Sequence, residues 1–85
     1  MSLGRALDND VVISDSRVSR YHAEIVREQA GRVVRDLGST NGTGLAGRPI
    51  ARDRLTHGDV ISLGGYRIEV YFDRAAESQP SDHDA

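Results

Sequence analysis

Large apolar residues recur at every second position in several short stretches of the chain, which is the pattern of strands with one buried face. The clearest stretch is 66–72, where every second residue from Tyr66 to Phe72 is large and apolar. Residues 59–63 precede it across a Gly-Gly pair, which can take the positive φ angles of a tight turn. The two stretches together predict an antiparallel hairpin.

The rest of the chain repeats this pattern of short strands and turns. Residues 49–55 favour one short edge strand, since Pro49 cannot donate to a ladder. No window of 11 or more residues has the period of a helix. Further strands are expected at 11–13, 21–27 and 31–37, with a turn at 29–31. This pattern predicts an all-β fold, an antiparallel β-sandwich or barrel.

Length and composition predict a single small domain. The chain has 85 residues, a net charge of −2 and no cysteine, so disulfides and thiolate metal sites are excluded and bulk charge does not indicate a nucleic-acid binder. No signal peptide is expected from the first residues, and no apolar run approaches the roughly 20 residues of a membrane helix. Residues 73–85 lack large apolar side chains, so a disordered, mildly acidic tail is expected there.

Two polar loops are expected at one end of the sheet. If the strands at 11–13, 21–27 and 31–37 form an antiparallel meander, alternate connections lie at the same end. These connections are residues 15–20 and 38–42, and both are rich in hydroxyl, amide or arginine side chains. The pairing predicts a binding surface carried on loops.

The side chains of these loops suit an anionic ligand. Ser19 and Thr40 can donate from hydroxyls, Arg17 and Arg20 from guanidinium groups, and Asn41 suits a peptide backbone. Charge-assisted hydrogen bonds stabilise by roughly 1.5–3 kcal/mol each, and micromolar affinity needs about 8 kcal/mol net. Three such bonds would be marginal for phosphate alone, so peptide backbone contacts are expected to help.

Several short motifs occur in a specific order. They are Gly4-Arg5, Ser19-Arg20-Tyr21-His22, Asp36-Leu-Gly-Ser-Thr-Asn-Gly-Thr43 and Gly58-Asp59. In this order and spacing, residues 3–72 resemble a forkhead-associated (FHA) domain. The resemblance implies a β-sandwich of FHA type that recognises phosphothreonine peptides in Ser/Thr kinase signalling, without catalysis, cofactor or metal.

The resemblance also implies roles for individual residues. Arg5 would contact the phosphate or support its loop, Ser19, Arg20 and Thr40 would bind the phosphate region, and Asn41 would bond the peptide backbone just after the phosphothreonine. The residues expected to support the site are Gly4, His22, Gly38, Ser39 and Gly42. Alternative interpretations are a surface ion pair of Arg5 with Asp8 or Asp10, and turn-stabilising hydroxyls at Ser39 and Thr43. Arg17 is expected to be a solvated surface residue.

The sequence gives little support to other classes of function. Ser19 and His22 lack the glycine pattern of a nucleophile elbow, so a catalytic triad is not expected. The glycine-rich loop lacks the Gly-Lys-Ser/Thr of a Walker A motif, and the histidines and carboxylates show no metal-ligand spacing. No basic stripe with interleaved aromatics indicates nucleic acid.

The family usually has further strands before the Gly-Arg pair, where this chain has three residues. Three explanations of this difference are considered. The chain is a fragment of a longer protein, or it is a degenerate domain, or a second copy supplies the missing edge, since an open strand edge is a template for pairing. A second function hypothesis is a phospho-independent interaction or assembly module that uses this edge, with a homo-oligomer as one form. The all-arginine usage favours a bacterial, cytoplasmic protein, with no nucleic-acid or membrane partner.

Overall fold

The structure is a computed structural model that describes residues 1–72, and the tail predicted at 73–85 lies outside these residues. No helix in the described part is long and apolar enough to cross a membrane. The described residues form these strands: β1 (Ser2–Gly4), β2 (Val11–Val12), β3 (Ala23–Glu28), β4 (Gly31–Asp36), β5 (Thr43–Leu45), β6 (Arg48–Ile50), β7 (Arg52–Leu55), β8 (Val60–Leu63) and β9 (Tyr66–Glu69).

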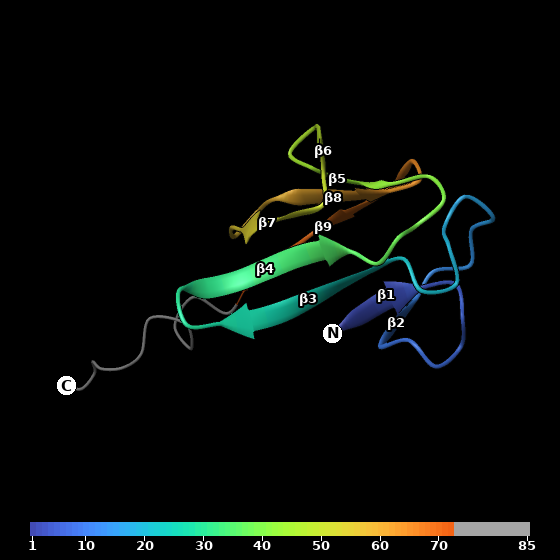
Figure 1. The fold of residues 1–85 in the computed structure, drawn as a ribbon, viewed down its shortest axis with the longest axis horizontal. Coiled ribbons are helices and arrows are strands. Elements are labelled where there is room, and N and C mark those ends of the chain that lie inside the picture. Colours follow the sequence, from blue (N-terminus) through green and yellow to red (C-terminus); the bar gives the residue numbers. More distant parts are fainter. Residues whose placement is uncertain (73–85) are drawn as a thin grey trace.

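The strands form two sheets that pack face to face (Figure 1). One sheet has the order β2-β1-β3-β4-β7 and the other has the order β6-β5-β8-β9. All neighbouring strands are antiparallel except β1 and β2, which are parallel. The predicted all-β sandwich is therefore confirmed.

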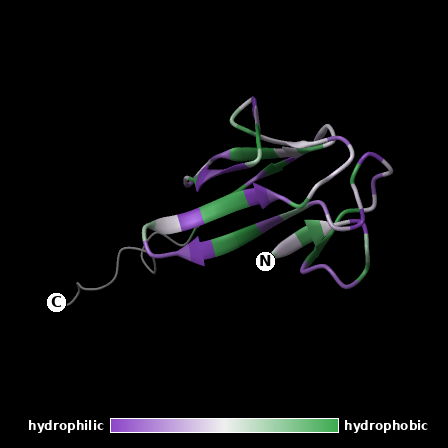
Figure 2. Cartoon of the chain, in the orientation of Figure 1, coloured by the Kyte–Doolittle hydropathy of each residue, from purple (hydrophilic) through white to green (hydrophobic). Residues whose placement is uncertain are grey.

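The core lies between the two sheets, as the alternation predicts. Figure 2 shows an apolar centre in β3 and in β4, flanked by polar ends. The largest fully buried side chains include Val34 from one sheet and Ile61 and Leu63 from the other. Burying each such side chain contributes about 1.5–3 kcal/mol to folding. This core fixes the sandwich and thereby the loops at its ends.

Three strand predictions differ from the structure. Residues 2–4 and 43–45 form strands that the sequence pattern did not predict, because each is too short to show alternation. The edge strand expected within 49–55 is two strands, β6 and β7, and they belong to different sheets. The chain crosses from one sheet to the other at Ala51, between these two strands.

The predicted meander is also wrong in one pairing, although its conclusion is correct. β2 pairs with β1, and β1 lies between β2 and β3. Because β1 is antiparallel to β3 and parallel to β2, the chain still runs antiparallel in β2 and β3. Residues 13–22 and 37–42 therefore meet at one end, together with residues 5–10 and the Gly64-Gly65 turn (Figure 1).

The hairpin predicted near the C-terminal side is present, with a shorter second strand. Leu63 pairs with Tyr66 across Gly64 and Gly65, which both have positive φ. β9 ends at Glu69 rather than at residue 72, and Tyr66 is 39% exposed despite its place in the alternation. Within residues 1–72, β9 pairs with β8 on one edge only.

Candidate functional site

Ser19 and Thr40 connect the two predicted loops directly. The backbone N–H of Thr40 donates to the Oγ of Ser19 at 3.0 Å. Ser19 therefore uses a lone pair within the protein, and its hydroxyl proton can be donated to a ligand. The bond joins positions 21 residues apart, so the hydroxyl is held in place by both loops.

His22 lies beneath this contact and is fully buried. Its Nδ1 accepts the backbone N–H of Ser19 at 3.0 Å, and its Nε2 lies 2.8 Å from the carbonyl oxygen of Gly42. Because Nδ1 accepts, the neutral ring carries its proton on Nε2 and donates it to Gly42. The side chain thus spans both loops from below and does not reach the surface.

Arg5 is fixed against the same loop by its backbone and its side chain. Its backbone N–H donates to Ser19 O at 3.0 Å, and its Nε donates to Val18 O at 2.9 Å. The ion pair considered as an alternative is not what the structure shows. Asp8 accepts from the hydroxyl of Tyr21, and Asp10 accepts from Ser2. Arg5 itself is exposed, with its Nε held at the residue before Ser19.

Two glycines allow neighbouring strands to pack tightly against the loop that contains Ser19. A Cβ on Gly4 would lie 2.2 Å from the carbonyl oxygen of Arg20, and a Cβ on Gly64 would lie 2.1 Å from that of Arg17. Any other residue would force the backbone apart at either position. Gly4 was expected to support the site, whereas Gly64 was predicted only as a turn residue.

Asn9 adds a contact that the sequence did not reveal. Its side chain is buried, and its Nδ2 donates to Arg20 O at 2.7 Å and to Ala6 O at 2.9 Å. The backbone N–H of Ala6 donates to the same Arg20 carbonyl at 3.1 Å. Residues 5–10 thus hold the backbone just after Ser19 in one place.

Asp36 organises the loop 37–42, and it is absent from the predicted site residues. Its carboxylate accepts hydrogen bonds from the hydroxyls of Ser39 and Thr43 and from the backbone N–H groups of Gly38 and Ser39. Burial raises the pKa of this carboxyl, but these hydrogen bonds outweigh it, so the pKa lies below its ordinary value. The signal was present in the sequence as an aspartate followed at short range by hydroxyl residues.

The remaining supporting residues of the loop 37–42 have local roles. The Oγ of Ser39 also accepts the backbone N–H of Gly42 at 2.9 Å, which agrees with the expectation that Ser39 satisfies the loop itself. Thr43 is buried and bonds Asp36 rather than the loop backbone. Gly38 and Gly42 adopt positive φ angles of 75° and 86°, a conformation that favours glycine.

Asn41 and Arg17 are linked across the loops. The Nδ2 of Asn41 donates to the carbonyl oxygen of Arg17 at 2.8 Å. The Arg17 guanidinium is bound by both oxygens of Asp15, and these hydrogen bonds lower the pKa of Asp15 to about 2. Arg17 is thus a surface residue paired with an acid, and Asn41 keeps its carbonyl oxygen for other partners.

Arg20 and Thr40 are both exposed on the loop surface around Ser19. The neighbouring Tyr21 donates to Asp8, which raises the pKa of its phenol, while the positive charge of Arg20 partly offsets this effect. The structure brings Ser19 into contact with Thr40, and the Nε of Arg5 bonds the carbonyl oxygen of Val18, the residue before Ser19. Arg20 directly follows Ser19 in the chain. Hydroxyl and guanidinium donors of this kind suit a phosphate group. Within residues 1–72, no group of three acidic or histidine side chains could hold a metal ion.

Comparison with known proteins decides the family. The sequence model of the FHA domain matches residues 1–64. The chain belongs to the FHA domain family. FHA domains are interaction modules rather than a family of enzymes.

Two curated relatives come from mycobacteria. An ABC transporter ATP-binding/permease protein of Mycobacterium tuberculosis is 42% identical over 62 residues, which are 73% of this chain and 7% of that protein. The glycogen accumulation regulator GarA of Mycolicibacterium smegmatis is 39% identical over 67 residues, which are 79% of this chain and 42% of that protein. The chain thus spans less than half the length of either relative.

Solved FHA structures share the fold. The FHA-2 domain of the M. tuberculosis ABC transporter is 37% identical with a TM-score of 0.77, over 82% of this chain and 65% of that domain. A structure from a study of phosphothreonine-dependent FHA domain interactions is 38% identical with a TM-score of 0.78, over 84% and 74%. M. tuberculosis EmbR in complex with a low-affinity phosphopeptide is 35% identical with a TM-score of 0.75, over 80% and 18%.

Proposed function

We propose that this FHA domain is a phosphothreonine-peptide reader in Ser/Thr kinase signalling, with Arg5, Ser19, Arg20, Thr40 and Asn41 as its binding residues. The observation that carries the proposal is the fixed hydroxyl of Ser19. The hydroxyl oxygen accepts from the backbone N–H of Thr40, and the backbone N–H of Ser19 donates to Nδ1 of the buried His22. The hydroxyl proton is therefore positioned for an external acceptor before any ligand arrives, which lowers the entropic cost of binding.

The charge of the ligand follows from the groups around Ser19. A phosphothreonine carries about −1.5 to −2 charges at neutral pH and three strong acceptor oxygens. Arg5 and Arg20 supply positive charge, and the nearby acids Asp8 and Asp15 are occupied by Tyr21 and Arg17. A phosphate at Ser19 therefore meets hydrogen-bond donors, while the carboxylates of Asp8 and Asp15 already have partners.

Asn41 is the residue that would bind the backbone of the peptide. Its amide already bonds one backbone carbonyl, that of Arg17, and its position beside Thr40 suits a second bond to the backbone just after the phosphothreonine. Because three phosphate contacts give about 5–9 kcal/mol before ordering costs, this backbone contact is needed for micromolar affinity. The relative described as phosphothreonine-dependent and EmbR with its phosphopeptide support this ligand class.

The experiment is a titration of the chain with one peptide in three forms: phosphothreonine, phosphoserine and unmodified threonine. We expect binding of the phosphothreonine form, weaker binding of phosphoserine and none of the unmodified peptide. Arg5→Ala should weaken binding by about tenfold or more. Arg54→Ala, an exposed arginine on β7 in the five-stranded sheet, is the matched control and should bind as the native chain does. Equal binding of all three peptide forms would rule the proposal out.

A second candidate function is a phospho-independent interaction through the outer edge of β9. The observation that favours it is that β9 pairs with β8 alone within the described residues, and an unpaired edge can accept a partner strand. The comparisons lend no support to a homo-oligomer at this edge. If both Arg5→Ala and Ser19→Ala leave partner binding intact, this candidate replaces the first. Both candidates keep the expectation of a cytoplasmic partner protein.

A further inference from the structure

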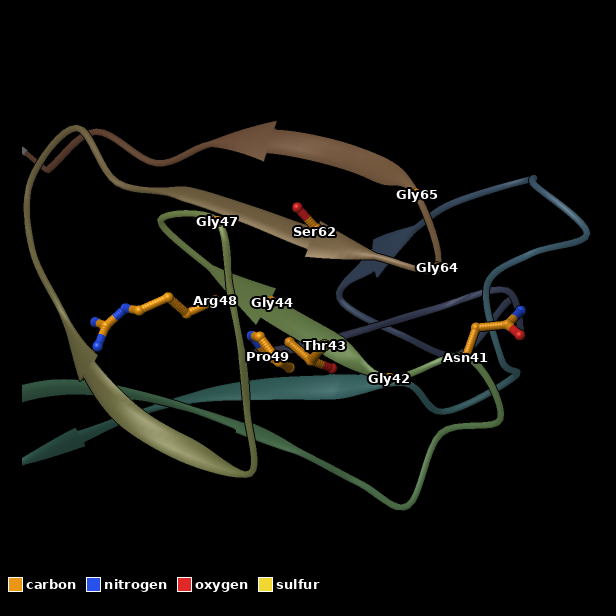
Figure 3. A pocket seen from close by; sticks show the side chains of 10 residues that line it. All are labelled: Asn41, Gly42, Thr43, Gly44, Gly47, Arg48, Pro49, Ser62, Gly64 and Gly65. Carbon is orange, nitrogen blue, oxygen red and sulfur yellow. The ribbon is translucent and has the colours of Figure 1, made fainter.

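A shallow groove of about 230 Å³ lies beside the predicted phosphopeptide site (Figure 3). It runs over the outer face of the four-stranded sheet, and Asn41 and Arg48 lie at opposite ends of the view. Asn41 therefore belongs both to the proposed binding loops and to the lining of this groove. We call it the β5–β6 groove.

The strand register explains why the groove is open. Gly44 pairs with Pro49 on one side and with Ser62 on the other. Neighbouring residues in a strand point to opposite faces, so these three face outward while Thr43 and Leu45 are buried. A row of larger outward side chains on β5, β6 and β8 would have filled this space.

The charge of the groove comes from one side chain. Among its lining residues, Arg48 alone has a charged side chain, and Figure 3 shows this side chain extending away from Asn41 at the end of the groove. Its nearest acidic group is Asp53, at the long distance of 3.6 Å, and the Arg48 side chain is 71% exposed. Such an exposed pair stabilises by little, so a carboxylate arriving in the groove can compete for the guanidinium.

The length of the groove sets which peptide residue reaches Arg48. Asn41 lies four positions before Leu45, which pairs with Arg48. Four fully extended residues span about 13 Å, so this separation is at most about that long, and an extended peptide crosses it in about four residues. If Asn41 holds the residue just after the phosphothreonine, Arg48 lies near about the fifth residue after it.

We propose that the peptide segment following the phosphothreonine lies in the β5–β6 groove and that Arg48 selects an acidic side chain about five residues after the phosphothreonine. The inference rests on the proposed function and adds the ligand's chemistry beyond the phosphate. The ligand is an extended peptide with a phosphothreonine and, farther toward its C-terminus, an acidic residue.

The test uses phosphothreonine peptides with an alanine-rich segment after the phosphothreonine. A single Glu, or a single Lys as its opposite, is placed at each position in turn from about the third to the seventh. Fluorescence anisotropy gives the Kd of each peptide. In the native chain we expect Glu near the fifth position to bind about two- to fivefold more tightly than alanine, and Lys more weakly by a similar factor. Arg48→Glu should reverse this order, whereas Arg54→Glu, on the other sheet, should preserve it.

A second measurement follows the groove without any substitution. In an amide nitrogen–proton correlation spectrum, Gly44 and Ser62 should shift with the long Glu peptide but not with a peptide that ends just after the phosphothreonine. Phosphate-dependent binding with no preference among the Glu and Lys peptides, or a preference that Arg54→Glu reverses equally, would overturn this inference alone. Equal binding of phosphorylated and unphosphorylated peptides would overturn the proposed function, and this inference with it.

Discussion

The backbone of Gly4 packs against the carbonyl group of Arg20 so closely that a Cβ on Gly4 would lie 2.2 Å from the Arg20 oxygen. The same carbonyl accepts hydrogen bonds from Ala6 N–H and from the side chain of Asn9. The position of Ser19, one residue earlier, therefore depends on a buried glycine that has no side chain to offer a ligand. This relationship gives the Gly of the Gly-Arg pair a physical role.

Gly4→Ala should destabilise the domain and weaken phosphopeptide binding. The methyl group has no space unless the loop with Ser19 moves, and overpacking of this kind costs about 1–3 kcal/mol. Urea denaturation and peptide titration would measure both effects. The matched control is Gly44→Ala, whose Cβ would be no closer than 3.4 Å to another atom and whose φ is not positive. It should change the free energy of unfolding by less than about 1 kcal/mol. Equal destabilisation by both substitutions would contradict the close-approach argument.

Ser19→Ala should weaken binding of the phosphothreonine peptide by about 10- to 100-fold, because one hydrogen bond to a charged oxygen is lost and Thr40 N–H loses its acceptor. Isothermal titration calorimetry would measure the change. Ser16→Ala is the control, since Ser16 is exposed on the same loop and not among the predicted site residues. It should bind normally. Unchanged affinity in Ser19→Ala would remove Ser19 from the site.

His22→Ala should act mainly on folding. The substitution leaves a cavity and takes away the partners of Ser19 N–H and Gly42 C=O, so we expect a loss of about 2–5 kcal/mol in the free energy of unfolding. For a domain of this size that is a large share of total stability. Chemical denaturation is the measurement. Phosphopeptide affinity per folded molecule should also fall, because Ser19 loses its support. A His22→Ala variant as stable as the native chain would contradict this structural role.

Strand period and turn residues were enough to predict the sandwich, because β3, β4 and β8 each carry core side chains from a stretch of at least four residues. β1 and β5 have only three residues each. Their position depends on pairing with distant strands, and a three-residue segment carries too little periodicity to reveal it. The split of 49–55 was missed for a similar reason. Only the contact of β6 with β5 and of β7 with β4 shows that these neighbours belong to different sheets.

The candidate site shows the same limit. The residues named from the FHA resemblance are side chains on three loops, and topology brings these loops to one end of the sandwich. Asp36 was missed although its partners lie within seven residues of it in the chain. Asn9 and Gly64 were not named as site residues, because their roles are contacts with backbone groups of other loops. Such contacts depend on the final packing. The side-chain chemistry of the loops and the FHA resemblance predicted the residues proposed to bind the ligand, whereas the tertiary structure was needed to identify Asn9 and Gly64, which hold the backbone of these loops in place.

Asp36 should make the stability of the domain depend on pH in the acid range. The folded pKa of its carboxyl is lowered, so its contribution is fully present above the unfolded value of about 3.9 and is lost as the pH falls through the folded value. The free energy of unfolding, measured by urea at a series of pH values below about 6, should show this loss in the native chain. Asp36→Asn should be less stable near neutral pH, and the difference between the two proteins should shrink in acid. A difference that stays constant across this range would contradict the assigned hydrogen bonds.

Ala46 should be a site at which the domain can be stabilised. It adopts a φ of +51°, followed by Gly47 at +83°, in the two-residue turn between β5 and β6. Left-handed backbone costs an alanine roughly 1 kcal/mol, and Asn-Gly is the pair that favours such a turn. Ala46→Asn should therefore raise the free energy of unfolding by about 0.5–1 kcal/mol in thermal or urea denaturation.

Ala30→Asn is the control for this prediction, since Ala30 lies in the turn between β3 and β4 without a positive φ, and it should give no such gain. Because Ala46 lies outside the loops with Ser19 and Thr40, phosphothreonine affinity should stay unchanged in Ala46→Asn. A gain of equal size in both variants would show that strain at Ala46 is not its source.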